Sequence, residues 1–323
     1  MKNQSQVTLA ITAFNESQRG DFDWIHECIA PAIHHPLVRE IVVVNDGTPD
    51  FGELVQNLSG IPKVRLFHNP VNLGVFGNKV TSVERSTSEW VLMCDSDNVM
   101  GEDYYDRLVD IGLWDSDAIY ATSFARPNFD YRSYIGEMSL EKFGDLQANG
   151  ANIRKLQDRY MFWCLANTGN QFVHRSAFLD ALDGIPRERF DLWQPNYFGV
   201  SQGGRPDMHW RMAYDAQDSF FINRMWLMAG GSIQIVDGLE YSHRVDKAAP
   251  GNYDRSPADK EALAPLYFLE LMETSKTGKC HRYQFDRRDR GHVFLYKDLD
   301  VPGRMVAVNM DISIPFFEFC DKG

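Results

Sequence analysis

The stretch Trp90-Val91-Leu92-Met93-Cys94-Asp95-Ser96-Asp97-Asn98 has the pattern of a buried strand that ends in two carboxylates one residue apart. An apolar run of this length between polar residues is typical of a central strand in a parallel sheet. Open α/β sheets bind ligands beyond the carboxyl ends of their strands, so Asp95 and Asp97 are expected where small-molecule chemistry takes place. Two carboxylates this close repel each other unless a positive charge lies between them, and a divalent cation that holds a diphosphate would supply it. The alternative is an Asp-rich turn that caps a helix starting at 101–103.

The composition is that of an ordinary globular protein. The chain has 323 residues, 44% of them hydrophobic and 24% charged, which is enough for one large or two small domains. The formal net charge of −12 argues against a generally nucleic-acid-binding surface. No apolar stretch approaches the roughly 18 residues of a membrane span, and residues 1–6 lack the apolar core of a signal peptide. The five cysteines are odd in number and show no zinc pairing, so free thiols in a reducing cytoplasm are predicted.

Strands and helices alternate along the first part of the chain. Strands are predicted at residues 7–14, 41–44, 64–67, 90–94 and 117–123, and helices at 22–32, 54–58, 74–85 and 104–113. This alternation is typical of βαβ units and predicts an α/β fold with a parallel sheet. Farther on, helices are predicted at 215–229 and 260–274 and a strand at 232–236, and residues 187–210 have the composition of a long loop, either a functional lid or disordered.

The order of these signals over residues 7–245 resembles the family 2 glycosyltransferases with the GT-A fold. Four motifs carry the resemblance: Ala10-Ile11-Thr12-Ala13-Phe14-Asn15-Glu16, Val42-Val43-Val44-Asn45-Asp46-Gly47-Thr48, Asn72-Leu73-Gly74 with Gly77-Asn78-Lys79, and Asp95-Ser96-Asp97, which matches the family's Asp-x-Asp. The resemblance implies a Rossmann-like, mostly parallel central sheet flanked by helices. It divides residues 1–245 into a nucleotide-sugar-binding half (1–123) and an acceptor-binding and catalytic half of the same domain (124–245). Residues 246–323, whose basic tail the family motifs do not reach, are expected to form a C-terminal helix with a basic aromatic extension.

The resemblance also assigns residues to a nucleotide diphosphate sugar as donor. The donor-binding set is Thr12, Ala13, Phe14, Asn15, Glu16, Asp46, Gly74, Lys79, Asp95 and Ser96. The Asp46 carboxylate can accept a hydrogen bond from a uracil or guanine N–H, Gly74 permits close approach of the backbone to a ligand, and Lys79 would meet a phosphate as a point charge. The plainer alternatives are a turn residue at Asp46, a helix start at Gly74 and a solvated side chain at Lys79. Phe14 either stacks on the base or belongs to the core.

Glycosyl transfer also needs a group that takes the proton of the acceptor hydroxyl. The resemblance points to Tyr214-Asp215-Ala216-Gln217-Asp218, where family members show Glu-Asp with the Asp as general base. This chain has Gln217-Asp218, so the motif is imperfect. We expect Asp218 to be the base and Asp215 to be the helix cap. The alternative for Asp218 is a carboxylate that only complements the helix dipole.

A third metal ligand is expected beside the two aspartates. Many GT-A enzymes place a histidine near the position of His243, so the resemblance implies Asp95, Asp97 and His243 as ligands of Mn²⁺ or Mg²⁺. An ordinary core or surface histidine is the alternative. Asn167-Thr168-Gly169-Asn170 resembles the family's small-residue turn beside the sugar, with a plain strand-to-strand turn as the alternative.

Residues 276–297 depart from the acidic average. They contain seven Lys and Arg and two Asp, a net charge of +5, interleaved with Tyr283, Phe285, Phe294 and Tyr296. Cations and aromatic rings together can hold DNA or another polyanionic acceptor. The alternatives are a solvated face or the contact of a homodimer.

The resulting expectation is a metal-dependent, inverting glycosyltransferase that moves a sugar from a UDP-sugar to an acceptor hydroxyl. Two alternatives stay open: a phage-type enzyme that glycosylates hydroxylated bases of DNA, and a non-catalytic sugar-nucleotide-binding or nucleotidyltransferase-like protein. Nucleotidyltransferases carry a Gly-rich loop with a basic residue soon after the first strand. Here Phe14-Asn15-Glu16 follows that strand and the first glycine is Gly20.

Overall fold

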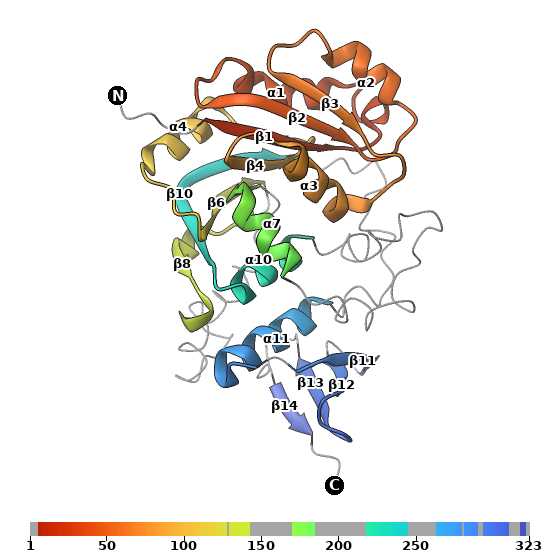
Figure 1. The fold of residues 1–323 in the computed structure, drawn as a ribbon, viewed down its shortest axis with the longest axis vertical. Coiled ribbons are helices and arrows are strands. Elements are labelled where there is room, and N and C mark those ends of the chain that lie inside the picture. The colour runs from red at the N-terminus through yellow and green to blue at the C-terminus, as the bar shows by residue number, and fades with distance from the viewer. Residues whose placement is uncertain are drawn as a thin grey trace.

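The structure is a computed structural model of the chain (Figure 1). It describes residues 6–127, 129–142, 170–184, 218–244, 263–279, 281–289, 293–309 and 317–320. Within these ranges no helix is long and apolar enough to cross a membrane.

The N-terminal part of the chain forms four parallel strands joined by helices. Strand β1 (Val7–Ala13) lies between β2 (Val38–Asn45) and β4 (Trp90–Asp95), and β3 (Val64–His68) pairs with the far side of β2, all in parallel register. The connecting helices are α1 (Asp23–His34), α2 (Phe51–Leu58) and α3 (Gly74–Arg85), with the short 3-10 turn η1 (Glu16–Gln18) directly after β1. Every residue of β1 is buried, as expected for a central strand with helices on both faces.

The sheet continues beyond β4 with strands of mixed direction. Strand β9 (Gln171–His174) runs antiparallel between β4 and β6 (Ala118–Arg126), and β6 is parallel to β10 (Ser232–His243). Three short strands complete the sheet: β5 (Asn98–Val99) and β8 (Gly136–Met138) pair with β10, and β7 (Phe129–Asp130) pairs with β6. The 3-10 turn η2 (Arg132–Tyr134) lies between β7 and β8. The predicted α/β fold with a mostly parallel, helix-flanked sheet is confirmed, and the proposed boundary at residue 123 falls inside β6.

The two faces of β4 bury different cores because successive side chains of a strand point to opposite sides. Trp90, Leu92 and Cys94 face the core under α1, α2 and α4 (Glu102–Asp110). Val91 and Met93 face the core under α3, α7 (Arg175–Asp183) and α10 (Asp218–Met228). The first core also holds two free thiols, because Cys94 lies 3.7 Å from the likewise buried Cys28 (Sγ to Sγ). The side chains of the other three cysteines lie outside the described residues.

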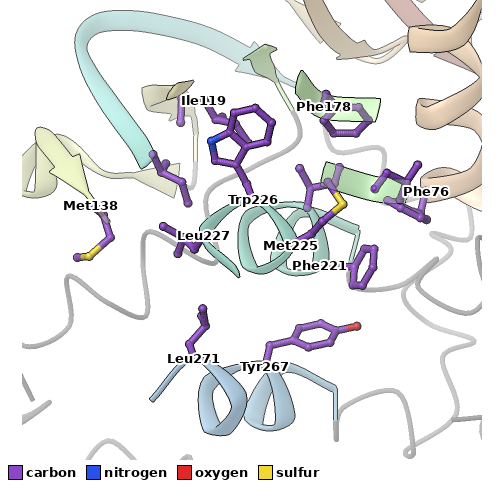
Figure 2. Packing of buried hydrophobic residues seen from close by; sticks show 14 of the residues in the cluster. Phe76, Ile119, Met138, Phe178, Phe221, Met225, Trp226, Leu227, Tyr267 and Leu271 are labelled. Atoms are coloured by element: carbon purple, nitrogen blue, oxygen red, sulfur yellow. The ribbon is translucent and has the colours of Figure 1, made fainter. Parts of the chain in front are cut away.

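A second, smaller sheet follows the long helix α11 (Leu263–Thr277). It is antiparallel and consists of β11 (Tyr283–Arg288), β12 (Val293–Asp298), β13 (Met305–Asn309) and β14 (Phe317–Cys320). Figure 1 shows α11 between this sheet and the rest of the molecule. In Figure 2, Tyr267 and Leu271 of α11 lie below α10, while Trp226 points from the opposite side of α10 toward the strands. Helix α10 is therefore buried from two sides.

Several predicted elements have different bounds in the structure. The helix expected at 54–58 begins at Phe51, the strand expected at 232–236 continues to His243, and the helix expected at 260–274 extends to Thr277. The helix expected at 215–229 is described from Asp218 to Met228, and Asp215 and Gln217 lie outside the described residues. The segments 187–210 and 167–169 also lie outside them, so only Asn170 of the predicted sugar-side turn is described.

Candidate active site

The carboxyl ends of β1, β2 and β4 meet at one edge of the sheet. The backbone N–H of Ser96 donates to the Thr12 carbonyl at 3.1 Å, and the backbone N–H of Asp46 donates to the Ala13 carbonyl at 3.0 Å. These two bonds place the segments after β2 and β4 on either side of the end of β1. The predicted donor-binding motifs, which are spread over more than eighty residues of sequence, are brought together here.

The Asp95 carboxylate is held at this edge by two groups. Its Oδ1 accepts a hydrogen bond from the Thr12 hydroxyl at 2.8 Å, and the Lys79 ammonium lies 3.3 Å from the same oxygen. Thr12 therefore supports a carboxylate, a role that the sequence had not indicated.

The Asp97 carboxylate has one oxygen that is not satisfied by the protein. Its Oδ1 is buried and has no hydrogen-bond partner among the described residues, while its Oδ2 lies 3.7 Å from the Arg19 guanidinium. Burial and the nearby charge of Asp95 raise the pKa of Asp97. A buried carboxylate oxygen without a donor is a place where a cation stabilises the protein.

The donor set fits a hard divalent cation that is shared with a ligand. No group of three His, Cys, Asp or Glu in the described part of the chain is arranged to hold a metal ion by itself. Magnesium-type sites commonly use one or two carboxylates and complete their coordination with water and substrate phosphates. Asp95 and Asp97 match that arrangement. The predicted third ligand, His243, is not brought together with them as a preformed three-ligand site.

His243 lies next to this site at the end of β10. The strand pairing of β10 with β5 sets His243 opposite Asn98, and the His243 Nδ1 lies 2.8 Å from the Asn98 Oδ1. The Asn98 amide in turn donates to the Asn170 Oδ1 at 2.9 Å. Because Asn98 presents its oxygen to the ring, Nδ1 carries the proton, and the lone pair of the imidazole is on Nε2. This tautomer is the one that a metal-binding Nε2 requires.

Lys79 joins the Asp95 site to the predicted base. It projects from α3, only 1% of it is exposed, and its ammonium lies 2.5 Å from the Asp218 Oδ2 at the start of α10. The alternative of a solvated lysine is therefore wrong. Asp218 itself is 8% exposed. The structure thus connects two carboxylates that are 123 positions apart in the sequence through one buried ammonium.

Asp46 is buried and has a structural task. Its Oδ1 accepts from the Asn69 amide at 3.0 Å and from the backbone N–H of Leu73 at 2.8 Å. These bonds fix the loop that leads into Gly74, the first residue of α3, whose φ of +77° favours glycine. At Gly47 a Cβ atom would lie 2.4 Å from the backbone of Val71, so this loop packs closely against the end of β2.

Glu16 and Ser96 lie beneath the two aspartates. Glu16 is fully buried, and its Oε1 accepts from the Ser96 hydroxyl at 2.6 Å and from the backbone N–H of Phe14 at 3.0 Å. Burial raises the pKa of Glu16 to about 7. The two side chains support the Asp95–Asp97 turn from inside. By contrast, Phe14 is only half-buried, and Asn15 has the left-handed φ of 54°.

Two arginines that the sequence reasoning missed lie beside Asp97. Arg19 is the one in ion-pair range, and the backbone N–H of Arg244 donates to the Asp97 carbonyl at 3.2 Å. The Arg244 guanidinium packs over the Trp24 ring and pairs with Glu27. Both arginines lie outside the family motifs; the position of Arg244 directly after His243 is the only signal that could have marked it.

Three of the four aromatic residues of the basic tail are buried, and the fourth, Phe285, is partly buried. Tyr283, Phe294 and Tyr296 are buried in the core that also contains α10 and α11. Several of the cations are used within the small sheet: Arg282 pairs with Asp300, and both Arg287 and Lys297 pair with Asp286. Arg290 lies outside the described residues. A stacking platform for nucleic acid, which needs exposed rings, is not formed by these three aromatic residues.

The described part of the chain has the fold of GT-A glycosyltransferases. The structure of S. aureus TarS residues 1–349 in complex with UDP-GlcNAc is similar to it, with a TM-score of 0.52 and 11% identity over 85% of this chain and 73% of that one. GalNAc-T7 with UDP, GalNAc and Mn²⁺ is also similar, with a TM-score of 0.51 and 12% identity over 96% of this chain and 68% of that one. At such identities the likeness establishes the fold.

The family model described as Glycosyl transferase family 2 matches residues 8–178, more than half of the chain. The chain belongs to this family and is a glycosyltransferase. No curated protein matches it in sequence.

Proposed function

We propose that this enzyme moves a sugar from a nucleotide diphosphate sugar, with UDP as the nucleotide, to an acceptor hydroxyl in a metal-dependent reaction that inverts the anomeric centre. The observation that carries the proposal is the buried Asp97 oxygen next to Asp95 after β4, for which the described residues supply no hydrogen-bond partner. The presence of UDP-GlcNAc in the TarS complex, and of UDP with Mn²⁺ in the GalNAc-T7 complex, supports the choice of nucleotide and metal.

The donor would lie across the carboxyl ends of β1, β2 and β4. Phe14 is half-buried after β1 and is the ring available to stack on the nucleotide base. Asp46 is proposed to face the base, in addition to fixing the loop before α3. Glu16, Ser96, Thr12 and Ala13 shape this edge from inside through the bonds described above.

Asp95 and Asp97 are proposed to hold Mn²⁺ or Mg²⁺ together with the diphosphate, and His243 is proposed to join them through Nε2 when the metal binds. A bound divalent cation neutralises the diphosphate leaving group. Arg19 adds a positive charge on the Asp97 side.

Asp218 is proposed to take the proton of the acceptor hydroxyl. It lies at the start of α10, and Lys79 ties it to the Asp95 carboxylate. One base that activates the acceptor for direct displacement gives inversion, because no enzyme nucleophile forms a covalent intermediate. The acceptor then approaches from the side of α10.

A panel of nucleotide sugars tests the proposal. We expect the enzyme to release free nucleotide diphosphate from a UDP-sugar in the presence of Mn²⁺, and not in excess chelator. Asp97→Ala should abolish this turnover, because it removes a predicted ligand, while Asp300→Ala, which removes a carboxylate between β12 and β13, should retain it. Full turnover in excess chelator, or by Asp97→Ala, would contradict the proposed metal site.

A further inference from the structure

Lys79 is unusual because it is a lysine with almost no exposed surface. It is 1% exposed and lies within the helix α3, whose residues 76–83 are all buried. Lysine is almost never fully buried unless its charge is paired, since removing one ion from water costs several kcal/mol. A structural reason for a cation at this position is therefore required.

The pairing partners of Lys79 belong to two different halves of the protein. Asp95 is at the end of β4, in the half that precedes residue 123, and Asp218 begins α10 in the second half. The ammonium lies 3.3 Å from the Asp95 Oδ1, 3.4 Å from its Oδ2 and 2.5 Å from the Asp218 Oδ2. In the proposed function, Asp95 helps to hold the metal and Asp218 takes the proton of the acceptor.

The rest of α3 makes the position of Lys79 rigid. Asn78 donates to the Val44 carbonyl at 3.0 Å and accepts from Asn69 at 3.1 Å, which fixes the helix to β2. On the α10 side, Phe76 packs edge-on against Phe221 with ring centroids 4.9 Å apart. The contact between α3 and α10 thus includes an apolar pair and an ion pair.

We infer that Lys79 is a positioning residue: it holds the Asp218 carboxylate at a fixed place relative to Asp95 and so aligns the base with the leaving diphosphate. This inference rests on the proposed function, because it requires Asp218 to be the base. It also changes the role expected from the sequence, in which Lys79 met a phosphate directly. The Lys79 ammonium contacts the Asp95 and Asp218 carboxylates, so it can align them relative to each other. Small losses of such alignment lower the rate strongly.

Lys79→Met separates positioning from direct phosphate contact, because it keeps the apolar length of the side chain and removes the ammonium. We expect kcat for hydrolysis of the donor to fall on the order of 10–100-fold, while the Kd of UDP with Mn²⁺ changes less than about threefold, since a factor of three is within 1 kcal/mol. A direct phosphate contact predicts the opposite pattern, with weakened UDP binding of tenfold or more. Lys297→Met, which removes an exposed lysine paired with Asp286 in the small sheet, is the matched control.

A double-mutant cycle with Asp218→Asn tests whether Lys79 acts through Asp218. If it does, Lys79→Met lowers kcat in the wild-type background and has less than about a threefold effect in the Asp218→Asn background. Equal losses of kcat in both backgrounds would overturn the inference. An Asp218→Asn enzyme with unchanged kcat would instead contradict the proposed base itself.

The double variant also tests the inference if Lys79→Met alone does not fold. Lys79→Met leaves two carboxylates without their ammonium, whereas Lys79→Met/Asp218→Asn removes one charge of each sign. If only the double variant folds, its kcat is compared with that of Asp218→Asn alone. Equal values support positioning through Asp218, and a further loss of tenfold or more overturns it.

Discussion

Glu16 is a carboxylic acid in the interior, directly beneath the turn that carries the two aspartates. Desolvation raises its pKa from 4.5 to about 7, although the hydrogen bonds from Ser96 and Phe14 act in the opposite direction. The folded protein therefore binds a proton at Glu16 between pH 4.5 and 7 that the unfolded chain releases. Stability attributable to this group is greatest below pH 4.5 and is lost as the pH rises through 7.

Glu16→Gln should abolish this part of the pH dependence. The difference in pKa corresponds to roughly 3 kcal/mol of unfolding free energy, so we expect the variant to be more stable than the wild type at pH 8 and to differ much less at pH 5. The glutamine oxygen can still accept from Ser96. Urea denaturation of both proteins at the two pH values measures the effect. An equal stability difference at pH 5 and pH 8 would show that Glu16 does not titrate in this range.

Asn98 is the residue that sets the tautomer of His243. If His243 is a metal ligand, Asn98→Ala should lower the affinity for Mn²⁺ on the order of 10–100-fold, as is usual when a partner of a ligating histidine is removed. Titration of Mn²⁺ followed by electron paramagnetic resonance measures this directly. Asn57→Ala, on an exposed face of α2, is the control. If Asn98→Ala binds Mn²⁺ with unchanged affinity, His243 is not a metal ligand.

Individual site residues were predictable where their position follows from a strand end. Asp95 and Asp97 follow an apolar run, and Asp46 follows another, so all three lie at the predicted edge. The contact of Lys79 with Asp218 was not predictable, because 139 residues separate them and only the packing of α3 on α10 brings them together. Burial of Glu16 was equally hidden, since a glutamate after a strand usually indicates a polar loop.

At the scale of elements, α10 and α11 are joined by a buried ion pair. Arg224 and Glu270 are each 2% exposed, and the Arg224 Nη2 lies 2.7 Å from the Glu270 Oε2. Phe221 and Tyr267 pack beside it with ring centroids 5.8 Å apart. Because α10 begins with Asp218, this contact fixes the helix of the proposed base from the side opposite to the sheet (Figure 2).

Replacing only one partner of this ion pair should destabilise the protein more than replacing both partners. Glu270→Leu leaves the Arg224 charge buried without its carboxylate, and we expect a loss of about 3–5 kcal/mol in the free energy of unfolding. Arg224→Met/Glu270→Leu should recover most of that loss, because no unpaired charge remains. Chemical denaturation of the three proteins checks this. A single variant within 1 kcal/mol of the wild type would mean that the pair is not buried as described.

Elements were predictable where an apolar run or a helical period was uninterrupted. The strands β1, β2 and β4 belong to this class, since each contains a run of three or more consecutive apolar residues. Strand β10 was predicted too short because Asp237 and Gly238 interrupt it, at the position where its pairing with β6 shifts register. The small C-terminal sheet was not predicted, because its Tyr and Phe lie close to Arg and Lys in the sequence and resemble a basic ligand-binding segment.

At the scale of the whole molecule, α10 lies between the large sheet and the C-terminal helix and sheet (Figure 1). Lys79 holds its first residue from the donor side, and Arg224 and Glu270 hold its middle from the C-terminal side. The described C-terminal region therefore stabilises the part of the chain that contains α10. Its buried aromatic residues Tyr283, Phe294 and Tyr296 belong to the same core as α10 and α11.

The central claim is that Asp95 and Asp97 bind a nucleotide diphosphate through a divalent cation. Calorimetric titration of UDP into the full-length protein tests it most directly, because the measurement needs neither the sugar nor the acceptor. We predict that UDP binds in the presence of Mn²⁺, and that the affinity falls at least about tenfold (1.4 kcal/mol) both in excess chelator and in Asp97→Ala. Binding of UDP with the same affinity in chelator as in Mn²⁺, by the wild type and by Asp97→Ala alike, would contradict it.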